Sequence, residues 1–230
     1  MNTITCVCFD VWNTILQSNP DFKKQRIQII AEAFSSEPSI IAKIANEIDI
    51  EFDKITDLTG RDFNCADRLK LIASKLKKDS YCNEEFLKQL EDNIDQAFLR
   101  FLPSLKSDDV IIALEQLKQK NVTICLLSNT GFISGVYMRK ALGLLGVMKF
   151  FDYSFFSDEI KIAKPNPEIF AFVTRTMGCM PYNVLHVGDN VLADYEGAIK
   201  FGMNALLLNT KETISNSATI HSLSELLVKI

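Results

Sequence analysis

The chain of 230 residues carries a formal net charge of -4, with 47% apolar and 23% charged residues. That apolar content excludes a mainly disordered chain, and the mildly acidic balance offers no electrostatic attraction to nucleic acid or to an anionic membrane. The first residues lack a basic segment and a long apolar run, so we expect neither a signal peptide nor a membrane span. The six cysteines form no CxxC pair, and we expect free thiols in a cytoplasmic protein rather than disulfides or a zinc site.

The N-terminal half pairs one strand pattern with a long helical block. Residues 4–9 form a short apolar run that we expect to be a β-strand. Four helical stripes of apolar residues follow between about residues 20 and 102, and Pro103 ends them. Four such helices can pack as a small bundle with their own core. We therefore expect a helical cap domain at residues 17–102, inserted into a core domain of residues 1–16 and 103–230.

The C-terminal half alternates between helix and strand patterns. Residues 108–120 predict an amphipathic helix, and the apolar runs at 122–127, 184–187 and 205–208 predict strands. These runs are continuously apolar, which is typical of strands covered on both faces. Strands separated by helices favour a parallel, doubly wound α/β sheet.

Polar residues follow three of these strands where each strand ends. Asp10 follows the first strand, Ser128 the second, and Asp189 the third after a glycine, while Asp194 comes five residues later. Ligands of open α/β sheets bind outside the carboxyl ends of the strands, so we expect these side chains to share one mouth. Converging carboxylates repel one another unless a cation joins them, and oxygen ligands favour a hard cation such as Mg²⁺.

A lysine adds the remaining component of a phosphoryl-transfer site. Lys164 precedes Pro165 in a loop before an expected helix. Ser128, the backbone amides that follow it, and Lys164 would suit an oxyanion, most simply phosphate. A carboxylate nucleophile, a hard metal and a lysine together are typical of phosphoryl transfer.

Four segments resemble, in order, the four motifs of the haloacid dehalogenase superfamily. They are Asp10-Val11-Trp12-Asn13-Thr14-Ile15-Leu16, Leu127-Ser128-Asn129-Thr130, Lys164-Pro165-Asn166-Pro167, and Gly188-Asp189-Asn190 with Asp194. The resemblance covers essentially the whole chain. It implies a Rossmann-like core with a helical cap of the first type (C1), and a hydrolase.

The resemblance also implies roles for the site residues. Asp10 would be the nucleophile that forms an aspartyl-phosphate. Asp10, the main-chain carbonyl of Trp12 and Asp189 would hold Mg²⁺, and Asp194 would support the metal.

The remaining implied roles concern the substrate. Ser128, Asn129 and Lys164 would hold the phosphoryl oxygens. The resemblance also implies that Lys164, like Asp10, is a catalytic residue. The expected partner is a small phosphorylated metabolite, with no nucleic acid and no membrane.

Trp12 departs from the pattern of the superfamily's phosphatases. They carry a second aspartate at this position, which protonates the leaving group, and an indole N–H cannot act as an acid or base near neutral pH. The dehalogenase branch has an aromatic residue here, but it lacks the metal ligand that Gly188-Asp189 provides in this chain. We therefore expect a Mg²⁺-dependent phosphatase. A metal-independent 2-haloacid dehalogenase-type hydrolase, and a weakly active member that binds a phosphorylated ligand or a protein partner, stay open as alternatives.

Three further polar residues have ordinary structural interpretations. His186 lies within an apolar strand and is expected to be a hydrogen-bonded core residue. Arg61 and Arg68, in the helical block, either face an anionic substrate or form salt bridges on a helix surface. The aromatic residues of that block are expected to form its core.

Overall fold

The computed structural model describes residues 3–208 and 218–229. Within these residues one parallel sheet has the strand order β5-β4-β1-β6-β7-β8. Its strands are β1 (Cys6–Phe9), β4 (Thr123–Ser128), β5 (Tyr153–Phe156), β6 (Val184–Gly188), β7 (Asn204–Leu208) and β8 (Thr219–Ile220). The predicted doubly wound α/β fold is confirmed, with β1 between β4 and β6.

Two strands of the sheet were not predicted from the sequence. β5 has the sequence Tyr-Ser-Phe-Phe, and its first residue is exposed because the strand lies at an edge of the sheet. β8 has two residues and pairs with β7 at the other edge. Neither has a continuous apolar run, because an edge strand buries less of its surface than a central one.

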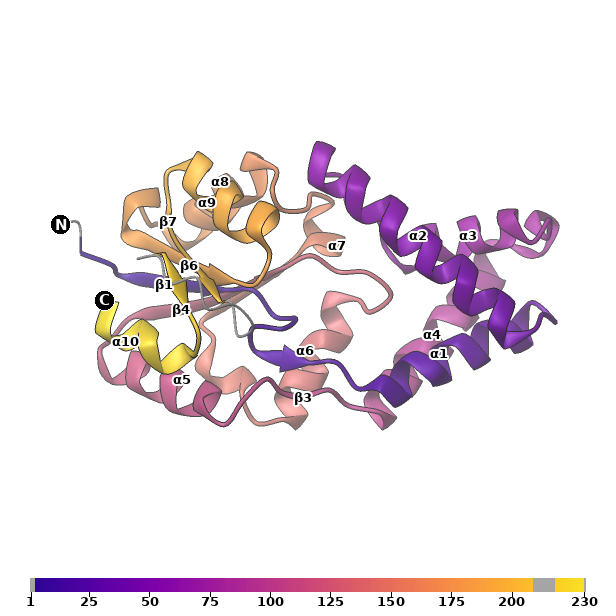
Figure 1. Cartoon of the computed structure of the whole chain (residues 1–230), viewed down its shortest axis with the longest axis horizontal. Coiled ribbons are helices and arrows are strands. Elements are labelled where there is room, and N and C mark those ends of the chain that lie inside the picture. Colours follow the sequence, from indigo (N-terminus) through magenta and orange to yellow (C-terminus); the bar gives the residue numbers. More distant parts are fainter. Residues whose placement is uncertain (1–2, 209–217, 230) are drawn as a thin grey trace.

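Helices cover both faces of the sheet. They are α5 (Asp109–Gln119), α6 (Gly135–Leu144), α7 (Ser157–Ile160), α8 (Pro167–Met177), α9 (Gly197–Phe201) and α10 (Leu226–Lys229). Shorter turns of helix are η2 (Met148–Phe150), η3 (Pro181–Asn183), the π-helix η4 (Val191–Glu196) and η5 (Leu223–Glu225). Figure 1 shows α8 and α9 on one side of the sheet and α5, α6 and α10 on the other.

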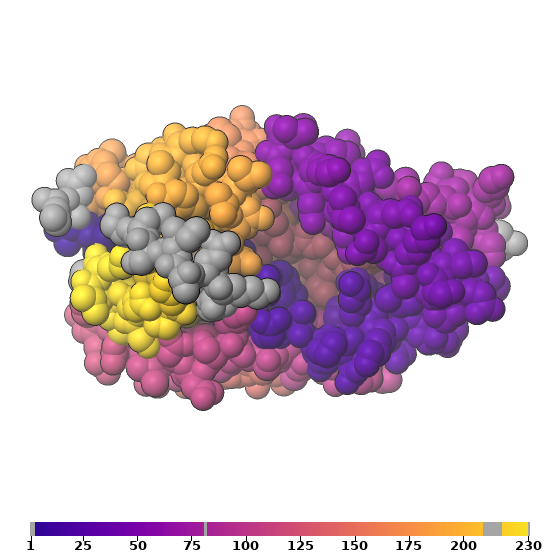
Figure 2. Space-filling view, viewed as in Figure 1, coloured from indigo at the N-terminus to yellow at the C-terminus, as the bar shows by residue number. Residues whose placement is uncertain are grey.

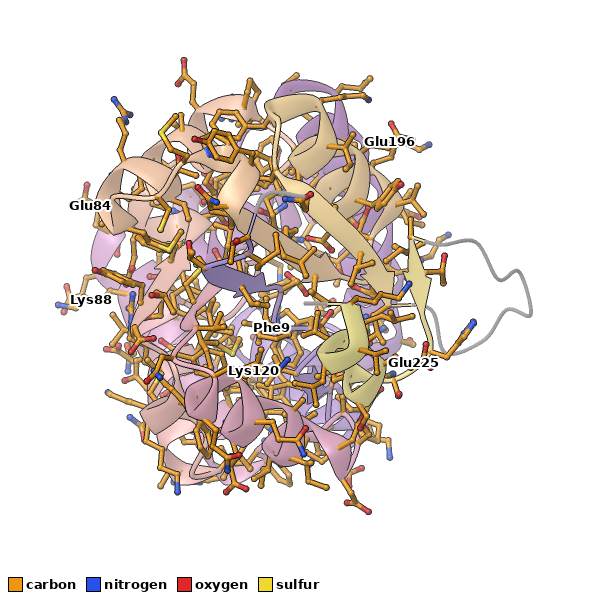
Figure 3. The ribbon with its side chains drawn as sticks, turned by 90° about the vertical axis from the view of Figure 1, so that its left-hand side faces the viewer. Phe9, Glu84, Lys88, Lys120, Glu196 and Glu225 are labelled. Carbon is orange, nitrogen blue, oxygen red and sulfur yellow. The ribbon has the colours of Figure 1, made fainter. Side chains whose placement is uncertain are left out.

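The side chains of β1 alternate between these two helical layers. Cys6 and Cys8 pack with α8 and α9, whereas Val7 and Phe9 pack with α5 and α6. All four side chains are fully buried. Figure 3 shows Phe9 near the centre of the molecule, with Glu84 at the outer surface. A strand buried on both faces explains the continuous apolar run of its sequence.

Four helices form the segment that we call the helical insert, residues 20–100. They are α1 (Pro20–Ala33), α2 (Pro38–Thr59), α3 (Cys65–Lys75) and α4 (Glu84–Arg100), with the short η1 (Asp79–Tyr81) before α4. The side chains of Asn19, Asn64 and Asn83 accept hydrogen bonds from the first turns of α1, α3 and α4. Aromatic pairs, among them Phe52 and Phe63 with ring centroids 4.0 Å apart, pack inside. The four predicted helices and the aromatic core are confirmed.

A two-stranded ribbon carries the chain into and out of the insert. β2 (Leu16–Gln17) and β3 (Ser104–Leu105) pair in antiparallel register. The N–H of Lys106 also donates to the carbonyl of Ile15 at 2.9 Å. Both crossings therefore lie side by side, and we propose this ribbon as the boundary between a core domain and a cap domain.

The insert touches the sheet-bearing part again at Gly60, directly after α2. Gly60 has a φ of +66°, and a Cβ there would lie 2.2 Å from Cβ of Asn166, so a larger residue would be both strained and obstructed. Its carbonyl accepts a hydrogen bond from the N–H of Ala163 at 2.8 Å. The insert thus contacts the loop that holds Lys164.

Among the described residues, none of the helices combines the length and apolarity that a membrane crossing requires.

Candidate active site

The neighbouring ends of β4, β1 and β6 bring the predicted polar residues together. Asp10 follows β1, and its N–H donates to the carbonyl of Val187 on β6 at 2.9 Å. Carboxylate oxygens of Asp10, Asp189 and Asp194 all lie within 4.8 Å of one another. Asp10 and Asp194 are buried, whereas Asp189 is exposed at the mouth. This donor set consists only of oxygen atoms, which suits a hard divalent cation.

Lys164 lies between two of these carboxylates and is 1% exposed. Its Nζ donates to Oδ1 of Asp10 at 2.9 Å, to Oδ1 of Asp194 at 2.6 Å and to the carbonyl of Leu127 at 2.6 Å. These contacts account for all three hydrogens of the ammonium group. Lys164 therefore neutralises the carboxylates and fixes their positions, and a phosphoryl oxygen would have to replace one of its present partners.

The two buried carboxylates have opposite pKa shifts. Burial raises the pKa of Asp10 to about 6, and the charge of Lys164 opposes this rise only in part. Burial alone would also raise the pKa of Asp194, but Lys164 and a hydrogen bond from His186 hold it well below its usual range. Asp194 therefore stays ionised near neutral pH, whereas the pKa of Asp10 lies at about 6 beside Lys164 in the absence of a metal ion.

The local backbone after β6 explains the position of Asp194. A Cβ at Gly188 would lie 2.2 Å from Cγ of Asp194, so only glycine allows the carboxyl group to approach the strand end. The N–H of Asn190 donates to Oδ2 of Asp194 at 3.0 Å, and Nε2 of His186 lies 3.0 Å from Oδ1. η4 then continues as a π-turn. His186 is fully buried, so its predicted role as a hydrogen-bonded core residue is confirmed.

The side chain of Asn129 holds Lys164 through its backbone. Its Oδ1 accepts from the N–H of Lys164 at 2.8 Å, and its Nδ2 donates to the carbonyl of Lys164 at 2.8 Å. These contacts make Asn129 a positioning residue for Lys164. The sequence did not predict this role of Asn129. Ser128, also buried, ends β4 next to it. Of these two residues, the hydroxyl of Ser128 and the main-chain N–H of Asn129 are the groups suited to an oxyanion.

The loop after Asp10 turns sharply and presents Trp12 to the insert. Asn13 adopts a φ of +57°, a left-handed conformation that asparagine tolerates. Ile15 and Leu16 both donate backbone hydrogen bonds to the carbonyl of Val11. The ring of Trp12 packs edge-on against Phe98 of α4 with centroids 6.3 Å apart. Trp12 therefore stands where the loop meets the insert.

A cavity of about 530 Å³ lies between the insert and the loops after β1 and β4. The residues that matter most among its lining are Trp12, Arg26, Arg68, Asn129 and Phe132. Figure 2 shows the surface hollowed where the insert faces the sheet-bearing part. Nothing in the sequence assigned Arg26 or Phe132 to a functional site. Arg26 lies in an ordinary amphipathic helix pattern, and Phe132 follows the motif that contains Ser128 without belonging to it.

The two arginines singled out from the sequence lie in different surroundings. Arg68 is 7% exposed and its guanidinium pairs with Asp49 on α2. Arg61 is exposed and stacks 4.7 Å from the ring centroid of Phe63, outside the cavity lining. Of these two, Arg68 faces the cavity.

A known family model matches most of the chain. The model of the haloacid dehalogenase-like hydrolases matches residues 4–202. The chain is 35% identical over 123 residues to a glyceraldehyde 3-phosphate phosphatase of Methanothermobacter thermautotrophicus, a match that covers 53% of this chain and 50% of that protein. The chain thus spans about half the length of that relative.

Two further matches cover more of the chain. The (S)-2-haloacid dehalogenase 1 of a Pseudomonas species is 27% identical over 212 residues, which are 91% of this chain and 86% of that protein. The crystal structure of the magnesium-bound HAD-hydrolase YfnB from Bacillus subtilis superposes with a TM-score of 0.71 at 20% identity, covering 99% of each chain. This structural likeness concerns the fold.

Proposed function

Since the chain belongs to the haloacid dehalogenase-like hydrolases, we propose that it is a Mg²⁺-dependent phosphatase that hydrolyses a small phosphorylated metabolite through an aspartyl-phosphate. The observation that carries this proposal is the convergence of Asp10, Asp189 and Asp194 within 4.8 Å beside a buried lysine. A relative named as a phosphatase of a three-carbon phosphate supports the substrate class. In this proposal the helical insert is the cap, and the six free thiols support a cytoplasmic location.

The carboxylates fit the metal that this reaction needs. Asp10, the carbonyl of Trp12 and Asp189 would hold Mg²⁺, with Asp194 supporting it, because hard cations prefer such oxygen ligands. When bound, the ion neutralises charge on the phosphoryl group and on the carboxylates.

The protein's own groups account for the covalent steps. A carboxylate oxygen of Asp10 attacks phosphorus, the bond from phosphorus to the leaving oxygen breaks, and that oxygen takes a proton from solvent. Water then attacks the phosphorus of the aspartyl-phosphate, which restores the carboxylate and releases inorganic phosphate. Ser128 and the N–H of Asn129 would hold the phosphoryl oxygens, while Lys164 offsets the negative charge.

Metal addition is expected to raise both activity and stability. Mg²⁺ should raise the midpoint temperature of unfolding, because it binds the folded state alone, and a chelator should abolish turnover. Its affinity should be nearly independent of pH above 7. Below about pH 6 protons compete for Asp10, whose pKa burial raises to about 6, so the affinity should fall by up to about tenfold per pH unit. Calorimetric titration at pH 5, 6 and 7.5 measures this slope, with Asp189→Asn as the variant that removes a ligand.

A chelator-resistant activity would contradict the metal-dependent mechanism. It would favour the second candidate, a metal-independent 2-haloacid dehalogenase, for which the aromatic Trp12 beside the nucleophile is the specific observation. Release of halide from 2-chloropropionate in the presence of chelator distinguishes the two candidates. The exposed Asp189 at the mouth favours the phosphatase, because a metal-independent reaction does not use it.

Replacement of Trp12 tests the missing general acid. Wild type should prefer aryl or acyl phosphates, whose leaving groups are stable anions, over alkyl phosphates. Trp12→Asp should raise alkyl-phosphate hydrolysis, up to the ~10²–10⁴ that acid–base catalysis contributes. The measurement is kcat/KM for phenyl and ethyl phosphate in both proteins.

The control for this variant concerns packing. Trp12 contacts Phe98, so its loss also removes an apolar contact, and thermal unfolding must be measured in parallel. The companion variant Trp12→Leu, which keeps an apolar side chain and adds no acid, should not accelerate the alkyl substrate. Equal wild-type rates on both esters would mean that another group supplies the proton.

A further inference from the structure

Arg26 on α1 is a partly buried cation without a counter-charge in contact. Its guanidinium lies 3.9 Å from the ring centroid of Phe132. Among the described residues neither an ion pair nor a hydrogen bond reaches the guanidinium, and its Nε is buried without a partner. Burial lowers the pKa of Arg26, and the charge of Asp49 offsets this only in part. A cation left in this condition is stabilised by any anion that enters beside it.

The position of Arg26 relative to the reaction centre restricts which anion this can be. Arg26 lines the same cavity as Trp12 and Asn129. Trp12 is two residues from the nucleophile, and Asn129 holds the backbone of Lys164. The cavity has a volume of about 530 Å³, which is within the range of small-metabolite pockets. Asp10 itself does not line the cavity, so a ligand with its phosphate at Asp10 has to reach past Trp12 and Asn129 to contact Arg26.

The charged residues that line the cavity leave one net positive charge, which a ligand with one negative charge would neutralise. Lys23, Arg26 and Arg68 face Asp49 and Asp53 among the described lining residues, which leaves one positive charge in excess. Arg68 pairs with Asp49 and Lys23 is exposed, so Arg26 is the cation of the lining that is partly buried and free of an ion pair. The guanidinium carbon lies over the ring of Phe132, and a planar guanidinium binds a carboxylate through two parallel hydrogen bonds.

We infer that Arg26 binds a carboxylate of the substrate. Among phosphate esters with the same type of leaving group, the enzyme therefore prefers a small ester that carries a carboxylate remote from the phosphate. This inference rests on the proposed phosphatase function, and it narrows the substrate class from small phosphorylated metabolites to those that also carry a carboxylate. Arg26 is a specificity-determining residue in this account and has no part in the covalent steps.

The kinetic test compares two three-carbon esters. 3-Phosphoglycerate carries a carboxylate where glycerol 3-phosphate carries a neutral carbinol. Wild type should favour 3-phosphoglycerate in kcat/KM, and Arg26→Met, which keeps the apolar stem on Phe132, should lower that value by roughly 10–100-fold, the usual effect of losing a charge-assisted hydrogen bond. The value for glycerol 3-phosphate should stay nearly unchanged. Equal losses on both esters, or no wild-type preference, would overturn the inference.

A binding test separates this inference from the phosphatase proposal. Glycerate, which has no phosphate, should bind wild type more tightly than glycerol does, and Arg26→Met should remove that difference in calorimetry. Arg61→Met is the matched control, because Arg61 also stacks on a phenylalanine but lies outside the cavity lining, and it should bind glycerate as wild type does. If no ester is hydrolysed but glycerate binding depends on Arg26, the phosphatase proposal fails and the carboxylate site stands. If Arg26→Met binds glycerate normally, the carboxylate site is refuted whatever the enzyme hydrolyses.

The folding of the variant provides an additional check. Removal of an unpaired, partly buried cation should leave the midpoint temperature of unfolding equal to that of wild type or higher. Arg26→Lys keeps the charge without the planar fork, and it should restore part of the preference for 3-phosphoglycerate. Absence of any rescue in a folded Arg26→Lys would show that charge contributes nothing to the selection.

Discussion

Asp10→Asn should lower turnover by about 10⁴-fold or more, the scale on which loss of a covalent nucleophile acts. The amide keeps the shape of the side chain but cannot attack phosphorus, and it weakens any metal held at the same oxygens. The measurement is single-turnover hydrolysis of an ester that wild type accepts, in saturating Mg²⁺. Turnover within about tenfold of wild type would exclude the aspartyl-phosphate mechanism.

The structure predicts that this variant stays folded. Burial raises the pKa of Asp10 to about 6, so ionisation of this group at pH 7 opposes folding when no metal is present, and a neutral amide removes that cost. The midpoint temperature of metal-free Asp10→Asn should therefore equal or exceed that of wild type. Asp92→Asn, on the exposed surface of α4, is the control, and it should change neither turnover nor stability.

Lys164→Met should disable the site and destabilise the protein as well. Methionine has similar length, but it leaves the carboxylates of Asp10 and Asp194 buried without their cation and the carbonyl of Leu127 without its donor. Breaking a buried ion pair in this way costs about 3–5 kcal/mol of unfolding free energy. We expect this loss near pH 7 by denaturant unfolding, together with a decrease in kcat/KM of at least about 10²-fold, as for other lost transition-state donors.

The pH dependence and two further variants identify the cause of this destabilisation. Lys164 holds the pKa of Asp194 well below its usual range, which contributes stability at pH values above the unfolded value of about 4. The difference between wild type and Lys164→Met should therefore shrink as the pH falls below about 4. Adding Asp194→Asn to Lys164→Met should recover part of the lost stability.

Lys200→Met is the matched surface control for the lysine. It removes an exposed pair with Glu196, and such pairs contribute at most about 1 kcal/mol. An equal loss in Lys200→Met and Lys164→Met would mean that the buried contacts of Lys164 do not stabilise the fold.

The sequence by itself determined the elements whose signals are local. Continuous apolar runs marked β1, β4, β6 and β7 because these strands are buried on both faces. Periodic apolar stripes marked the helices of the insert. The strand-end positions of Asp10, Ser128 and Asp189 also followed, because parallel strands point their carboxyl ends toward one edge.

Only the tertiary structure decided which side chains share a charge or a hydrogen bond. Asp10 and Lys164 are 154 residues apart in the chain and meet at 2.9 Å. The two hydrogen bonds from the side chain of Asn129 to the backbone of Lys164 also join segments that are distant in the sequence. The unpaired state of Arg26 likewise depends on how distant helices and loops pack around it. The edge strands β5 and β8 likewise form by pairing with a neighbour. The type and spacing of neighbouring residues predict local conformation. Ion pairs, burial and the shape of the cavity depend on contacts between residues that are far apart in the chain, and no short segment of the sequence predicts those contacts.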